Sequence, residues 1–178
     1  MLKFNQGLDK ALSIVTAIAL ILMMLHIVLH AVMRFSFNAP IYGTNEIVAY
    51  WWLPIVALLG IPAAQLQKEQ ITVTLAVDRM NHKTASIFKI FAAVLGVLVS
   101  LGFAWFGFEE AMDNMAMGST AGVTDITTWP VYFLVPVVFV LLAILYFLDI
   151  VLIARTGEPD VDLTTGERVE HEIEDAII

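Results

Sequence analysis

The chain has 178 residues, a formal net charge of −8 and no cysteine, and 60% of its residues are hydrophobic. A soluble domain usually has an apolar share of about 45–50%, so this composition argues against a soluble protein. The lack of cysteine excludes disulfides and every mechanism that needs a thiolate.

Four apolar stretches dominate the chain. A helix needs about 20 residues to cross the hydrocarbon core of a bilayer, which is about 30 Å thick, and each stretch is near or above that length. We therefore predict an all-α membrane protein with four transmembrane helices in one membrane domain, residues 1–153, and no separate soluble domain. The stretches cover residues 11–33, 47–66, 90–108 and 131–153.

Basic residues are distributed unevenly around these stretches. Eight of the nine Lys and Arg residues lie on one side, and the positive-inside rule makes that side cytoplasmic. Both termini are therefore predicted to be in the cytoplasm. The inner residues are Lys3, Lys10, Lys68, Arg79, Lys83, Lys89, Arg155 and Arg168, and the outer one is Arg34.

The segments between and after the spans differ in character. The second span holds Pro54 and Pro62, which predict a kinked helix. The inner connection, residues 67–89, mixes apolar with basic residues and is expected to lie along the membrane surface. Residues 154–178 carry eight acidic residues against two arginines, so we expect a solvated, disordered cytoplasmic tail.

Aromatic side chains give a second indication of the topology. Tryptophan and tyrosine gather at membrane–water interfaces, where one end of the ring is apolar and the other is wet. They lie near the outer ends of the spans, in agreement with the charge distribution. The expected anchors are Trp51, Trp52, Trp105, Trp129 and Tyr132.

Two histidines in the first span are candidates for chemistry. His26 and His30 are four residues apart and share one helix face. A haem or metal site would need further ligands, but the other spans hold no histidine and the chain has no cysteine. We favour the alternative that both imidazoles form hydrogen bonds across a helix–helix interface. No cofactor is expected.

Charged residues lie near the ends of the spans. Arg34 and Glu46 flank a short outer connection and are candidates for an ion pair between the first two helices; alternatively, Arg34 snorkels and Glu46 complements the helix dipole. The acidic run at 109–113 indicates a solvated helix end. No span carries an acidic residue at its middle, which counts against an ion-coupled transporter that works alone.

Small residues recur in the third span at intervals of four. Such a face lets two helix backbones approach closely, within the chain or between subunits. No motif for nucleophilic, zinc-dependent or phosphate-binding catalysis is present, so we do not expect an enzyme. The candidates for a subunit interface are His26, His30, Arg34, Glu46, Ala92, Gly96, Ser100 and Ala104.

Two stretches of the chain resemble the small membrane subunit of TRAP transporters, the DctQ-like family. One departure is Gln70, where family members commonly have histidine. The first stretch comprises Arg34, Glu46, Leu59-Gly60-Ile61-Pro62-Ala63-Ala64, Lys68-Glu69-Gln70-Ile71-Thr72-Val73 and Asp78. The second comprises Gly118-Ser119-Thr120, Thr128-Trp129-Pro130-Val131-Tyr132 and Pro136.

The resemblance implies a tripartite uptake system in a bacterial inner membrane. A periplasmic binding protein captures an organic anion, and a large (M-type) membrane subunit moves it with a sodium gradient. The small subunit braces the large one and helps the binding protein to dock. Its partners would be the large subunit, transiently the binding protein, and membrane lipids, with no nucleic acid.

Two alternatives remain open. A small multidrug-type exporter acting as a homodimer also has four spans, although such proteins generally need an acid within a span. A cytochrome b-like redox subunit would depend on His26 and His30 alone.

Overall fold

Helices make up most of the protein. The computed structural model describes residues 2–67, 81–122, 124–157 and 163–164. Within these residues, four helical stretches are long and apolar enough to cross a membrane, as predicted. The helices are α1 (Leu2–Phe37), α2 (Thr44–Ile47), the π-helical turn η1 (Val48–Trp52), α3 (Leu53–Leu66), α4 (His82–Met117), α5 (Trp129–Tyr132) and α6 (Leu134–Thr156).

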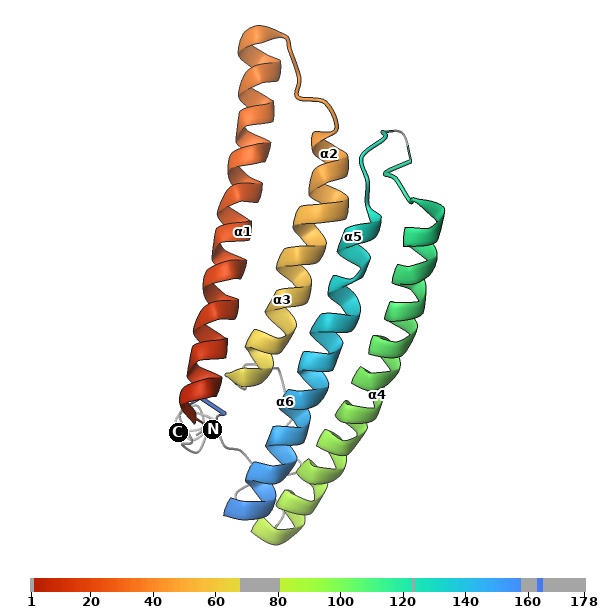
Figure 1. The fold of residues 1–178 in the computed structure, drawn as a ribbon. Coiled ribbons are helices and arrows are strands. Elements are labelled where there is room, and N and C mark those ends of the chain that lie inside the picture. Colours follow the sequence, from red (N-terminus) through yellow and green to blue (C-terminus); the bar gives the residue numbers. More distant parts are fainter. Residues whose placement is uncertain (1, 68–80, 123, 158–162, 165–178) are drawn as a thin grey trace.

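The four long helical stretches stand side by side in a row (Figure 1). α1 packs on α3, α3 packs on α6, and α6 packs on α4. α1 and α4 therefore form the two edges of the row, and many of their apolar side chains are exposed. Exposed apolar surface of this extent is typical of a protein that meets lipid or another subunit.

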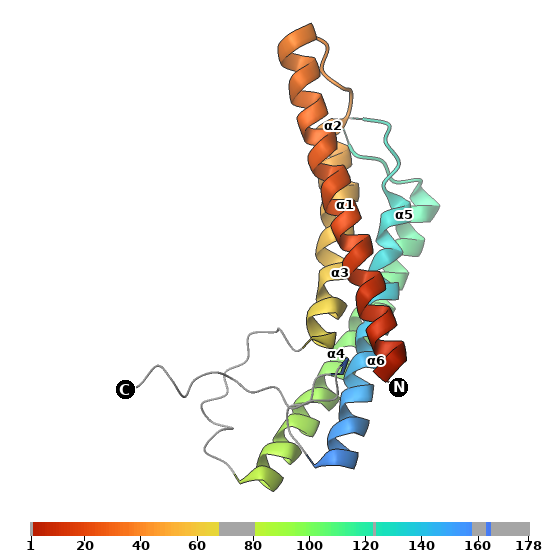
Figure 2. The ribbon, with the colours of Figure 1, turned by 90° about the vertical axis from the view of Figure 1, so that its left-hand side faces the viewer.

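The row is staggered along its length (Figures 1 and 2). α1 extends beyond its neighbours where it ends at Phe37, and α4 and α6 extend beyond α1 at the opposite end. Following the topology predicted from charge, we call the Phe37 end the outer end and the other the inner end. The start of α1 and the end of α6 both lie toward the inner end.

α1 and α4 are longer than the predicted spans. Each has 36 residues, which corresponds to a length of about 54 Å. α4 begins at His82, so the last part of the expected surface connection is helical; residues 68–80 lie outside the described residues. The hydropathy pattern ends at Lys89, but residues 82–89 contain no glycine or proline that would stop the helix.

The second span contains the predicted irregularity. Pro54 has no N–H, so it cannot form the α-helical hydrogen bond to the carbonyl of residue 50. The backbone makes a π-helical turn over Val48–Trp52 directly before α3, whose second residue is Pro54. Pro62 lies buried inside α3.

Both edge helices pack along seams with a seven-residue repeat. Such a repeat keeps one stripe facing a partner helix that crosses at a small angle. The seam on α1, the helix that packs on the second span, consists of Asn5, Leu12, Ala19, His26 and Met33, all buried or half-buried. The α4 seam, which faces α6, consists of Ser86, Ala93, Ser100, Gly107 and Asn114.

Candidate functional site

A hydrogen-bonded cluster joins α1 to the second span near the outer end. Trp52 Nε1 donates to His26 Nδ1 at 3.3 Å, and His26 Nε2 lies 3.4 Å from Thr44 Oγ1. Thr44 Oγ1 donates to the Ile41 carbonyl at 3.2 Å, and His30 Nδ1 lies 3.2 Å from the same oxygen. We call these five residues the outer polar cluster.

The hydrogen-bond partners in the cluster determine which ring nitrogen of each histidine carries a proton. The Trp52 N–H can only donate, so His26 Nδ1 accepts and the proton of the neutral ring is on Nε2, toward Thr44. The Ile41 carbonyl can only accept, so His30 Nδ1 carries a proton. Both imidazoles thus form the hydrogen bonds expected of histidines at an interface between segments of the membrane domain. A role for them at a subunit interface stays a prediction.

A hairpin between α4 and α5 packs against the same end of the second span. Thr120 and Thr127 pair in an isolated β-bridge, and Trp51 Nε1 donates to the Thr127 carbonyl at 2.9 Å. Gly43 has a φ of +70°, and a Cβ atom there would collide with the Ile126 side chain. The outer surface is therefore built from residues of both halves of the chain.

The two charged candidates at the outer end do not meet. Arg34 is exposed in the last turn of α1, and Glu46 is half-buried in the first turn of α2. No ion pair joins them in the described part of the chain. The position of Glu46 agrees with the dipole alternative, because a carboxylate is favourable at a helix N-terminus.

The aromatic anchors lie on three different helices. Trp51 and Trp52 belong to η1, and Trp129 and Tyr132 belong to α5. Trp105 is exposed on α4, where its Nε1 donates to Glu109 Oε1 at 3.1 Å. Their contact with the membrane interface stays a prediction.

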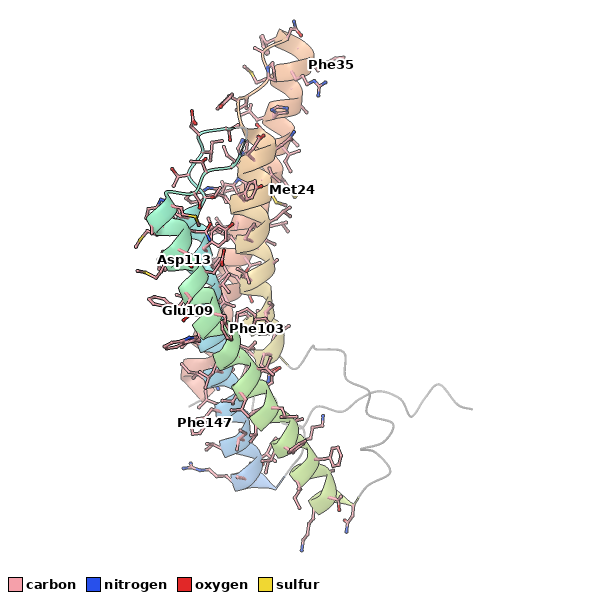
Figure 3. The ribbon with its side chains drawn as sticks, turned by 90° about the vertical axis from the view of Figure 1, so that its right-hand side faces the viewer. Met24, Phe35, Phe103, Glu109, Asp113 and Phe147 are labelled. Carbon is pink, nitrogen blue, oxygen red and sulfur yellow. The ribbon has the colours of Figure 1, made fainter. Side chains whose placement is uncertain are left out.

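Carboxylates of α4 lie lower in the row than the tip of α1. Figure 3 shows Glu109 and Asp113 closer to the inner end than Met24 and Phe35 of α1. Both carboxylates are exposed, and α4 continues beyond them to Met117. Their solvation stays a prediction.

Three of the four small residues predicted to share a face lie between α4 and α6. Ser100 and Ala104 are buried, and a Cβ atom on Gly96 would lie 3.0 Å from ring atoms of Tyr146. Ala92 is exposed. A strict four-residue step rotates a face by about 40° each time in a helix with 3.6 residues per turn, so it cannot follow one seam for long.

The sequence did not predict the tight contact at Gly107. A Cβ atom on Gly107 would lie only 2.7 Å from Val135 Cγ1. Ala93, Gly107 and Ala111 belong to this interface, although the four-residue stripe predicted from the sequence does not include them. The seven-residue spacing of small residues was the available signal. Because this seam lies within the chain, a role between subunits stays a prediction.

Buried polar contacts also join the helices at the inner end. Asp149 is only 4% exposed and accepts a hydrogen bond of 3.1 Å from Gln65 Nε2, linking α6 to α3. Gln67 Nε2 donates to Asp9 Oδ1 at 2.8 Å, linking the end of α3 to α1. Within the described ranges, no group of three His, Asp or Glu residues is arranged to hold a metal ion.

Near both ends of the row, polar contacts thus hold the apolar helices together. The family described as "Tripartite ATP-independent periplasmic transporters, DctQ component" matches residues 12–156. The chain belongs to the DctQ family. No curated protein and no solved structure matches it. It is accordingly a component of a TRAP transporter and a multi-pass protein of the bacterial inner membrane.

The matched region of this DctQ protein runs from the inner part of α1 to the last residue of α6. It includes the outer polar cluster, the hairpin and most of both seams. The first residues of α1 and the described residues 163–164 lie outside it.

Proposed function

We propose that this DctQ protein is the small membrane subunit that braces the large membrane subunit of a sodium-driven uptake system for an organic anion. Both of its termini are cytoplasmic. The large subunit performs the transport, and the small one binds neither the anion nor sodium. The periplasmic binding protein docks transiently at the outer end.

The distribution of charge is the main support for this proposal. The predicted spans 11–33, 47–66 and 90–108 contain no Lys, Arg, Asp or Glu, and the fourth, 131–153, contains only Asp149. Transporters that couple transport to an ion gradient usually carry ionisable groups within the membrane. The buried carboxylate of Asp149 is near the inner end, in a hydrogen bond with Gln65. The protein therefore suits a scaffold better than a pump or exporter.

The packing of the edge helices supports lateral association. α1 contacts the second span along one side, and many of its other side chains, such as Ile21 and Leu25, are exposed and apolar. α4 likewise turns its small residues to α6 and its large ones outward; Phe106, for example, is 70% exposed. A partner subunit and lipid can share these surfaces.

The outer end supports a docking role. The α1–α2 connection and the α4–α5 hairpin contact each other through Gly43 and Ile126, and Trp51 bonds to Thr127. These contacts join two loops from distant parts of the chain into one surface. A binding protein that docks there would meet an ordered platform.

Reconstitution tests the proposal. The tagged chain would be purified from its native membrane in mild detergent, its partners identified by mass spectrometry, and each component placed in liposomes with a sodium gradient. We expect one large polytopic partner at equal stoichiometry, and uptake only when both membrane subunits and the binding protein are present. Self-association with transport by the chain alone would support the exporter instead, and a Soret band would support the redox subunit.

A further inference from the structure

Two residues beyond the last helix contact the inner end of the first one. Asn5 Nδ2 donates to the Leu163 carbonyl at 2.8 Å in a buried hydrogen bond. In the next residue along α1, Gln6 Nε2 donates to the Thr164 carbonyl at 2.9 Å. Consecutive side chains of α1 thus bind consecutive carbonyls of a segment about 158 residues away.

The side chain of Leu163 completes an apolar cluster. It is 2% exposed and packs with Leu12 of α1, Leu66 of α3 and Leu145 of α6. Leu163, which follows α6 in the chain, therefore contributes to an apolar core that three helices share. Removal of a leucine from such a site exposes apolar surface and leaves a void.

The contact leaves the Asn5 amide oxygen in an unfavourable position. The residue is 2% exposed, and its Oδ1 is buried with no hydrogen-bond partner among the described residues. A buried amide oxygen without a partner is unfavourable. Because the Leu163 carbonyl can only accept, the Asn5 amide must point its nitrogen there.

Among the described residues, α1 is also held at this end by the leucine cluster and by the hydrogen bond from Gln67 to Asp9. We propose that Leu163 and Thr164 form a latch that holds the inner end of α1 against α3 and α6. The outer polar cluster then holds α1 at one end and this C-terminal latch at the other. The latch residues lie beyond the family match, and the inference does not depend on the proposed function.

Paired cysteines test the contact in native membranes, because the chain has no cysteine of its own. A short thiol crosslinker should join Gln6→Cys to Thr164→Cys within one chain. The matched control is Gly7→Cys with Thr164→Cys, since residue 7 is exposed, has open space around it and is rotated by about 100° from residue 6. Equal crosslinking of both pairs would overturn the latch.

A second pair reports whether the latch holds α1. Asp9→Cys and Gln67→Cys lie across the α1–α3 contact at the inner end. Leu163→Asp should slow their crosslinking by about tenfold or more, the factor that corresponds to losing one buried leucine, whereas Leu163→Met should leave it unchanged. An unchanged rate in Leu163→Asp would overturn the proposal.

A pair at the outer end separates a released latch from a misfolded protein. His30→Cys and Ile41→Cys lie across the contact in the outer polar cluster. In Leu163→Asp they should crosslink as in the parent. If Leu163→Asp prevents crosslinking of both pairs, Asn5→Ala is used in its place, because it leaves the leucine cluster intact. Asn5→Ala should slow crosslinking of the inner pair only. An unchanged rate for the inner pair in Asn5→Ala would overturn the proposal.

Discussion

A single methyl group added at Gly107 should weaken the contact between α4 and α6. The Cβ atom of Gly107→Ala would lie 2.7 Å from Val135 Cγ1, 3.4 Å from Val135 Cβ and 3.6 Å from Pro136 Cδ. Carbon atoms in contact normally stay about 3.5–4.0 Å apart. Val135 has few rotamers to move into because it is β-branched, so the helices must separate.

Two terms determine the size of the effect. Overpacking of a well-packed interface costs about 1–3 kcal/mol, and the change from glycine to alanine within a helix contributes about 1 kcal/mol in the opposite direction. Gly102→Ala is the matched control, because it lies on the same helix and nothing is within 4 Å of its Cβ position. The difference between the two variants therefore isolates the overpacking cost, about 1–3 kcal/mol.

The measurement is the free energy of unfolding in detergent, followed by tryptophan fluorescence as a denaturant is added. Gly107→Ala should be less stable than Gly102→Ala, and Val135→Ala combined with Gly107→Ala should recover much of the loss. Equal stabilities of the two single variants would refute the close approach at Gly107.

Three further substitutions test other contacts. Gly43→Ala should be less stable than Gly118→Ala by about 1–3 kcal/mol in the same assay, because both glycines have positive φ but only Gly43 has a side chain in the way; equal losses would contradict the contact. His26→Phe removes two hydrogen bonds worth about 0.6 kcal/mol each in membrane proteins, so stability should fall by about 1 kcal/mol while uptake by the assembled system persists; uptake lost from an intact complex would assign His26 a role beyond packing. Thr16→Val removes a buried hydroxyl that has no partner among the described residues, so stability should stay constant or rise by up to about 1 kcal/mol, and a clear loss of stability would show that this hydroxyl is bonded.

The membrane helices could be predicted because hydropathy depends only on local composition. The seams could not be found in the same way. In a soluble helix the buried face is the more apolar one, but in α1 the exposed residues include Ile14 and Leu25 while the seam includes Asn5, Ala19 and His26. Residue size and seven-residue spacing identify the buried face here, because helices in lipid pack through small residues.

Contacts between residues far apart in the chain could not be predicted from the sequence. Spacing predicted that His26 bonds across an interface, but Trp52 as its partner depends on how α1 and η1 are aligned. The tail composition predicted disorder after residue 153, yet α6 continues to Thr156 and Leu163 is buried in the core. For residues 165–178, which lie outside the described residues, disorder stays a prediction.

The stagger of the row has a consequence for the surrounding bilayer. Arg34 at the tip of α1 lies at the outer end, whereas Glu109 and Asp113 of α4 lie lower (Figure 3). A bilayer surface that leaves all three charges in water and keeps the exposed apolar residues Val28 and Val32 of α1 in lipid would run obliquely across the row. We therefore expect the helices to lean away from the membrane normal. Leaning also brings a larger part of each helix, about 54 Å long, within a hydrocarbon core about 30 Å thick. Since long helices lean further in thinner bilayers, the lipid acyl-chain length will change the angle at which this subunit presents its edges to a neighbour.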